Sequence, residues 1–142
     1  MSTEVIVYVL TALAALVIVL TRLRLGRDDG AAGRVHVGRL LLNIHTGSGA
    51  TALVVWLVFL VGGGSMSDNA AGVVGILALA LWWVVVVAGL LILVRWLPSR
   101  GKHAATGTED TWSDGPGLSV LAHVGMLVGV GVFTWAYLTS VV

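Results

Sequence analysis

The sequence GRVHVGRLLLNIHTGSGATALVVWLVFLV, residues 33–61, decides the fold, because it changes from basic and polar to almost continuously apolar within a few residues. Its last charged residue is Arg39, and no Asp, Glu, Lys or Arg follows up to Val61. An apolar run of this length crosses a hydrocarbon core of about 30 Å as an α-helix. His45 lies inside the run, where an ionisable side chain is costly and therefore marks a candidate functional site.

The composition of the 142-residue chain indicates an integral membrane protein, since 58% of the residues are hydrophobic, 11% are charged and the mean hydropathy is +1.01. Soluble domains carry about 25% charged residues. The chain has no cysteine, which excludes disulfides, thiolate metal sites and cysteine-held iron–sulfur clusters. It also shows no nucleophile–base pair and no phosphate-binding loop. We therefore expect no hydrolase, no nucleotide enzyme and no nucleic-acid partner.

The apolar runs predict an all-α membrane protein in which a single domain, residues 1–142, forms a bundle of four transmembrane helices. The predicted spans cover about residues 5–20, 40–61, 72–94 and 118–139. Each is long enough, at about 16–25 residues, to cross the membrane as a helix.

The basic residues predict the orientation of the bundle. All eight Lys and Arg residues lie in the two segments that join the first span to the second and the third span to the fourth. The positive-inside rule places both of these basic loops in the cytoplasm and both termini on the extracytoplasmic side. The Val-, Ala- and Gly-rich spans with short loops suggest a bacterial inner membrane.

A second histidine, His123, lies in the last span at a depth that matches His45. His45 is six residues beyond Arg39, and His123 is six residues beyond Gly117, which is about 9 Å of helix rise in each case. Because both helices run outward from the cytoplasm, we expect the two rings at one level in the cytoplasmic half of the membrane. A possible internal repeat, with His45-Thr46-Gly47 matching His123-Val124-Gly125, would place the rings opposite each other across a pseudo-twofold axis.

Two imidazoles beside small residues are the ligand pattern of a bis-histidine haem. Iron with both axial positions filled by histidine favours electron transfer over oxygen chemistry. We therefore predict haem b as the cofactor and His45 and His123 as its metal ligands. Gly49, on the His45 face, is predicted to leave room for the cofactor, and Arg39, at the cytoplasmic rim, to pair with a haem propionate.

On these residues the chain resembles the four-helix membrane b-type cytochromes, such as cytochrome b561 and the cytochrome b subunits of formate dehydrogenase and hydrogenase. The resemblance rests on four short-looped helices and on histidines with nearby glycines, namely His45 with Gly47 and Gly49, and His123 with Gly125 and Gly129. It implies an electron-transfer or accessory subunit of a respiratory or redox complex rather than a stand-alone enzyme. Many of those families hold two haems, whereas the outer halves of these spans contain no histidine and leave ligands for one.

Two other interpretations of the histidines remain open. They could brace the bundle by hydrogen bonds to Asn43, Thr46 or Thr51, in a non-catalytic subunit or assembly factor. Alternatively, one of them could bind a quinone or handle a proton. In every case the expected partners are the lipid bilayer and either other membrane subunits or further copies of the chain.

Further features predict how the helices pack. The motif Gly125-x-x-x-Gly129 indicates close helix packing, either inside the bundle or against a partner. Trp56 and Trp135 are predicted to lie in interfacial aromatic belts. Trp82 and Trp83, near the middle of their span, are expected either to line a cofactor pocket or to contact lipid.

Overall fold

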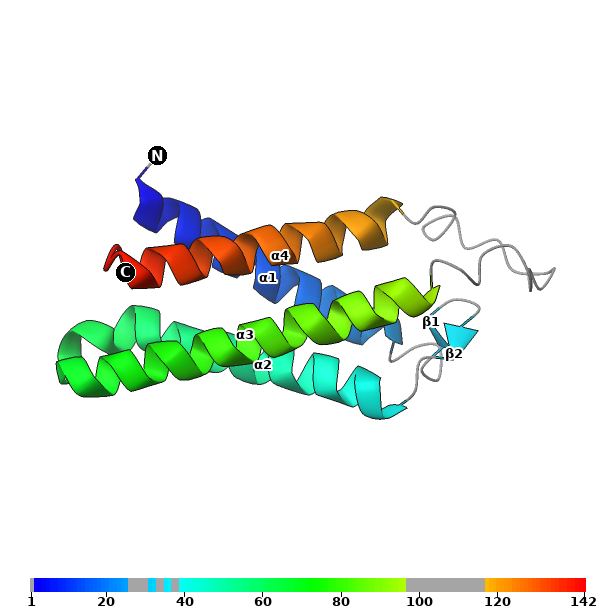
Figure 1. Cartoon of the computed structure of the whole chain (residues 1–142), viewed down its shortest axis with the longest axis horizontal. Helices are drawn as coiled ribbons and strands as arrows, with labels where there is room; N and C mark the ends of the chain where they lie inside the picture. Colours follow the sequence, from blue (N-terminus) through cyan, green and yellow to red (C-terminus); the bar gives the residue numbers. More distant parts are fainter. Residues whose placement is uncertain (1, 26–30, 33–34, 37–38, 97–116) are drawn as a thin grey trace.

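The computed structural model describes residues 2–25, 31–32, 35–36, 39–96 and 117–142, and these form a bundle of long helices (Figure 1). The elements in chain order are α1 (Thr3–Leu25), β1 (Ala31–Ala32), β2 (Val35–His36), α2 (Arg39–Gly62), the 3₁₀ turn η1 (Gly63–Ser65), α3 (Asp68–Trp96) and α4 (Gly117–Leu138). The two short strands pair antiparallel, with Ala31 opposite His36. The predicted all-helical class is confirmed, apart from this small ribbon.

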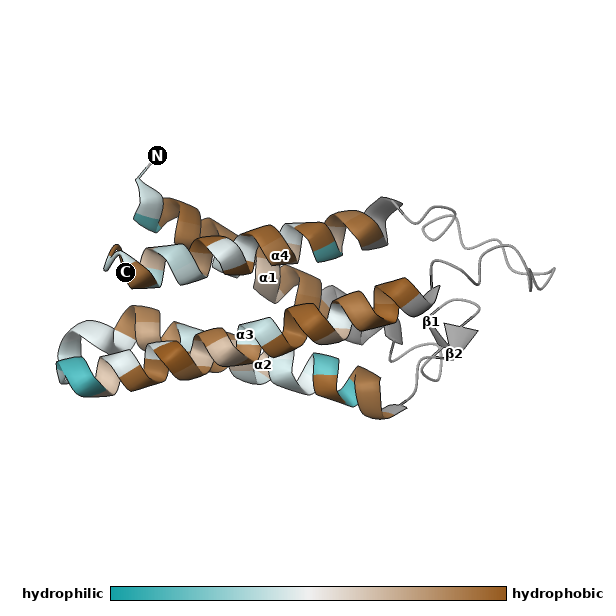
Figure 2. Ribbon diagram, in the orientation of Figure 1, coloured by the Kyte–Doolittle hydropathy of each residue, from teal (hydrophilic) through white to brown (hydrophobic). Residues whose placement is uncertain are grey.

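Three segments of the described chain are long and apolar enough to cross a membrane: Leu40–Ser65, Asp68–Val94 and Val120–Leu138. The apolar stretch of α1, Thr3–Val19, is shorter. Apolar residues cover the surface of the helices as well as their contacts (Figure 2), and Val61 and Leu138 are 80% and 74% exposed. Exposed apolar surface on this scale needs lipid or a partner to cover it, so the chain is a multi-pass membrane protein.

The helices alternate in direction, so that both chain termini lie at one end of the bundle (Figure 1). α2 and α4 therefore run the same way, as predicted from the loops. α2 and α3 form a tight hairpin through η1 and share the most extensive helix contact. The start of α3 is capped by the Ser67 hydroxyl, which accepts the backbone N–H of Ala70 at 3.4 Å, and the negative charge of Asp68 suits the positive end of the helix dipole.

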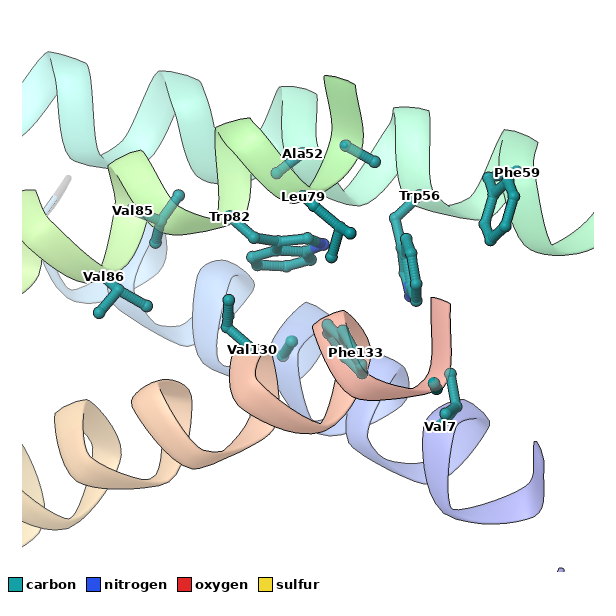
Figure 3. Close-up of a cluster of buried hydrophobic side chains, with 13 residues drawn as sticks. Val7, Ala52, Trp56, Phe59, Leu79, Trp82, Val85, Val86, Val130 and Phe133 are labelled. Atoms are coloured by element: carbon teal, nitrogen blue, oxygen red, sulfur yellow. The ribbon is translucent and has the colours of Figure 1, made fainter. Parts of the chain in front are cut away.

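The core is a cluster of aromatic and aliphatic side chains in the half of the bundle nearer the termini (Figure 3). Trp56, Trp82 and Phe133 are fully buried. The ring centroids of Trp56 and Phe133 are 4.9 Å apart, and those of Trp82 and Phe133 are 5.8 Å apart. Such offset and tilted pairs stabilise a core beyond the area that they bury.

Hydrogen bonds tie the core to the other helices. Trp56 Nε1 donates to the Thr11 hydroxyl at 3.1 Å, and that hydroxyl donates to the Val7 carbonyl at 2.8 Å, so α2 is joined to α1. The Tyr137 hydroxyl donates to the Gly72 carbonyl at 2.9 Å and joins α4 to α3. The interfacial position predicted for Trp56 is therefore wrong, because a paired indole N–H lets the ring sit in the core without an unsatisfied donor.

The neighbouring tryptophans of α3 have different environments. Trp82 packs in the core, and its Nε1 is buried without a hydrogen-bond partner in the described part of the chain. Trp83 is 40% exposed and donates to the Thr134 hydroxyl of α4 at 3.3 Å. Trp135 is 52% exposed, as the interfacial prediction expects.

Candidate functional site

The two intramembrane histidines meet inside the bundle. The ring centroids of His45, on α2, and His123, on α4, are 6.2 Å apart, and the ring planes are inclined by 20°. Both side chains are partly buried. The predicted meeting of the two rings, carried at one level by helices of the same direction, is thus confirmed.

Helix α3 holds the His45 ring through its backbone. His45 Nδ1 donates to the Val85 carbonyl at 3.1 Å. In a neutral imidazole this places the proton on Nδ1 and leaves the lone pair on Nε2. This hydrogen bond therefore fixes both the tautomer and the orientation of the ring.

Two of the partners that the sequence suggested for a structural role, Thr46 and Thr51, donate their hydrogen bonds within their own helix. The hydroxyls of Thr46 and Thr51 donate to carbonyls of their own helix, those of Leu42 and Gly47, both at 2.9 Å. In a membrane helix, a Ser or Thr hydroxyl can donate its hydrogen bond to the backbone carbonyl one turn earlier in the same helix. His45 is instead held by a backbone acceptor of a neighbouring helix.

Gly89 of α3 lies close to both rings. A Cβ atom at residue 89 would stand 2.8 Å from Cδ2 and 3.1 Å from Nε2 of His123, and 3.1 Å from Cε1 of His45. The first distance is shorter than real Cβ atoms show and the other two are tighter than most, so at least one ring would have to shift. Residue 89 must therefore be glycine for the two rings to approach each other as they do.

Sequence reasoning missed Gly89, although a signal for it was present. Gly89 is six residues before Arg95, just as His45 is six residues after Arg39. Equal distance from the basic loops places Gly89 at the level of the histidines. The rotation of α3 could not be predicted in the same way, because this helix is apolar around its whole circumference.

Of the two other predicted site residues, Gly49 lies beside the site and Arg39 begins α2. A Cβ at Gly49 would be 3.6 Å from Ile18 and 3.7 Å from Val85, which is ordinary contact, so this glycine faces α1 and α3. The side chain of Arg39 lies outside the described part of the structure. Its predicted role with a propionate stays a prediction.

A small cavity borders His45 on the side of α1. Its volume is about 40 Å³, and about 10–15 Å³ is enough for one water molecule. It is lined by Val17, Ile18, His45, Thr46, Val85 and Met126. The lining is apolar except for the imidazole and the Thr46 hydroxyl, and it includes one thioether, that of Met126.

The glycine motif of α4 does not pack inside the bundle. No atom of another residue lies within 4 Å of a Cβ placed at Gly125 or Gly129, among the residues that the structure describes. The in-bundle alternative for Gly125-x-x-x-Gly129 is therefore wrong. The other alternative, contact with a partner, stays a prediction.

The ring spacing suits the axial ligands of a haem, but the space beside the rings does not suit its macrocycle. Pockets for organic ligands and cofactors measure about 300 Å³ or more, whereas the cavity at His45 is about 40 Å³. The α3 backbone at Gly89 also lies against both rings, where a macrocycle between them would have to extend. In the described arrangement these residues do not fit a haem.

No cluster of three or more His, Asp or Glu side chains suitable for a metal occurs among the described residues. A metal at this site would therefore be held by the two imidazoles with donors of another kind. Together, the fold and the site define a multi-pass helical membrane protein with one intramembrane histidine pair. Comparison with protein-family models, curated proteins and solved structures finds no match for the chain.

Proposed function

We propose that the chain is a membrane subunit that binds one transition-metal centre between His45 and His123. The observation that carries the proposal is the 6.2 Å separation of the ring centroids. Imidazoles that hydrogen-bond directly, with nitrogens about 2.9 Å apart, have centroids roughly 5 Å apart. Two imidazoles whose nitrogens face each other across a metal, each nitrogen about 2 Å from it, have centroids roughly 6 Å apart.

The surroundings of the rings also support a metal site. Histidine ligands commonly donate their second ring N–H to a backbone carbonyl or carboxylate, which orients the ring and raises its basicity. The hydrogen bond from His45 Nδ1 to the Val85 carbonyl has this form. Gly89, which borders both rings, adds no side-chain atom that would crowd them.

Two kinds of metal centre are compatible with the ring spacing. Haem b would make the chain a cytochrome b-like electron carrier of a respiratory or redox complex, in line with its resemblance to that class. Haem binding would require α3 to lie farther from the rings at Gly89 than it does in this structure. A bare metal ion needs no such movement. A purely structural role is the alternative, and the hydrogen bond from His45 to the Val85 carbonyl of α3 is the kind of contact that it requires.

Elemental analysis and absorption spectroscopy of the detergent-purified protein test the proposal. We expect about one metal centre per chain in cells supplied with iron, copper and haem precursor, and its loss in both His45→Ala and His123→Ala. His103→Ala is the matched control, since this histidine lies in the polar segment between the predicted third and fourth spans, and it should retain the metal. Background metal content in the well-folded parent protein would contradict the proposal.

We further propose a bacterial inner-membrane location, with α1 as a fourth span and the loop end of the bundle in the cytoplasm. The positive-inside rule supports this orientation. Because the chain has no cysteine, single cysteines at Ser2 and Ser67 can be labelled in spheroplasts with an impermeant maleimide. Both should react from outside, and protection of either would contradict the orientation or the fourth span.

A further inference from the structure

The donor atoms around the histidine pair are soft or borderline. Met126 lies three residues after His123 on α4, so the two side chains are neighbours on the helix surface. Met126 also lines the cavity that borders His45. Met126 thus borders a space shared with one ring and belongs to the helix that carries the other.

The donor set discriminates between metal ions. Mg²⁺ and Ca²⁺ require several oxygen ligands, but the cavity lining contains no carboxylate. Structural zinc takes four ligands, usually thiolate or imidazole, and the chain has no cysteine. Copper(I) is the ion that thioether and imidazole donors favour together.

The volume of the cavity beside His45 also favours a single metal ion over a haem. The cavity of about 40 Å³ accommodates one ion or a few waters and no macrocycle. Its lining includes His45 and Met126, and the ring centroid of His123 lies 6.2 Å from that of His45.

On the basis of the proposed function, we infer that the resident metal is a single copper(I) ion bound by His45, His123 and the Met126 thioether. His45 coordinates through Nε2, because its Nδ1 is engaged by the Val85 carbonyl. The chain is then a copper-binding membrane protein, and a haem is not part of it.

Anaerobic copper(I) titration against a chromophoric chelator, with X-ray absorption at the copper edge, tests this inference on the full-length purified protein. We expect one copper(I) per chain with nitrogen and sulfur scatterers. Met126→Leu, a change that conserves volume, should weaken binding about 10-fold or more and remove the sulfur scatterer. Met66→Leu is the matched control, since Met66 directly follows η1 in the turn between α2 and α3.

Each other outcome has a distinct meaning. Haem absorption bands that depend on His45 and His123 and are unchanged in Met126→Leu would overturn the copper inference and leave the proposed function standing. Copper binding that Met126→Leu does not weaken would overturn the thioether assignment. Absence of any metal that depends on the two histidines, in protein with native circular dichroism, would overturn both the inference and the proposed function.

Discussion

The two halves of the bundle differ in how tightly side chains fill their interiors. Toward the termini, Trp56, Trp82 and Phe133 fill the interior without exposed surface. Toward the loops, His45 and His123 are partly buried, and a small cavity borders His45. The same four helices pass through both halves, so the difference comes from side-chain size and polarity alone. We infer that the aromatic half supplies stability and that the histidine half is packed less tightly, as the proposed binding site requires.

The largest expected effect on stability is in the aromatic half. Trp56→Ala removes a fully buried ring and its hydrogen bond to Thr11, and it should lower the free energy of unfolding by about 3–5 kcal/mol. Detergent–SDS titration followed by circular dichroism measures this loss. The unaltered His45–His123 pair should still bind metal in the fraction that remains folded. A loss under 1 kcal/mol would contradict the assignment of stability to the aromatic half of the bundle.

Gly89→Ala tests the histidine half. The added methyl group would overlap both rings, so metal content should fall to background. Overpacking should cost about 1–3 kcal/mol of unfolding free energy, which is less than the loss in Trp56→Ala. Normal metal content in this variant would show that the metal does not bind in the space that residue 89 and the two rings share.

Thr11→Val sharpens the comparison within the aromatic half. It keeps the shape of the side chain but removes the acceptor for Trp56 Nε1. We expect a loss of about 1 kcal/mol, because interhelical hydrogen bonds in membranes are weak and their loss leaves a buried donor unpaired. Metal binding should be unchanged, as measured by elemental analysis beside the unfolding titration.

The smallest effect is expected for Gly125→Ala. Nothing in the described structure lies within 4 Å of the added methyl group, so stability should change by no more than about 0.5 kcal/mol. It is also a glycine-to-alanine control for Gly89→Ala on a neighbouring helix. Gel filtration with light scattering gives an independent reading, since a smaller particle in this variant would place a partner on the glycine face.

The sequence predicted the helices well because hydrophobic length is a local property. The predicted span 40–61 became Arg39–Gly62, and 118–139 became Gly117–Leu138. The predicted span 5–20 matches the apolar stretch Thr3–Val19, whereas the helix α1 continues to Leu25 through a basic stretch. Hydropathy marks where a helix leaves the hydrocarbon, whereas its backbone hydrogen bonds continue into the polar region.

Only part of the candidate site could be predicted from the sequence. The level of His45 and His123 followed from their distance to the loops, but their contact with Val85 and Gly89 depends on how α3 is rotated. A helix that is apolar on all sides carries no pattern to fix that rotation. Trp56 was misplaced for a related reason, because only the fold brings Thr11 within reach of its indole N–H.

The buried aromatic side chains of the core affect how a molecule could move along the bundle axis. Val85, whose carbonyl holds His45, lies at one end of the buried cluster, and Phe59 lies at the other (Figure 3). A solute that reached the rings from the loop end would meet tightly stacked indole and phenyl groups beyond them. The buried aromatic side chains thus fill the bundle interior on the terminal side of the histidine pair, so a species bound at the rings would not leave in that direction.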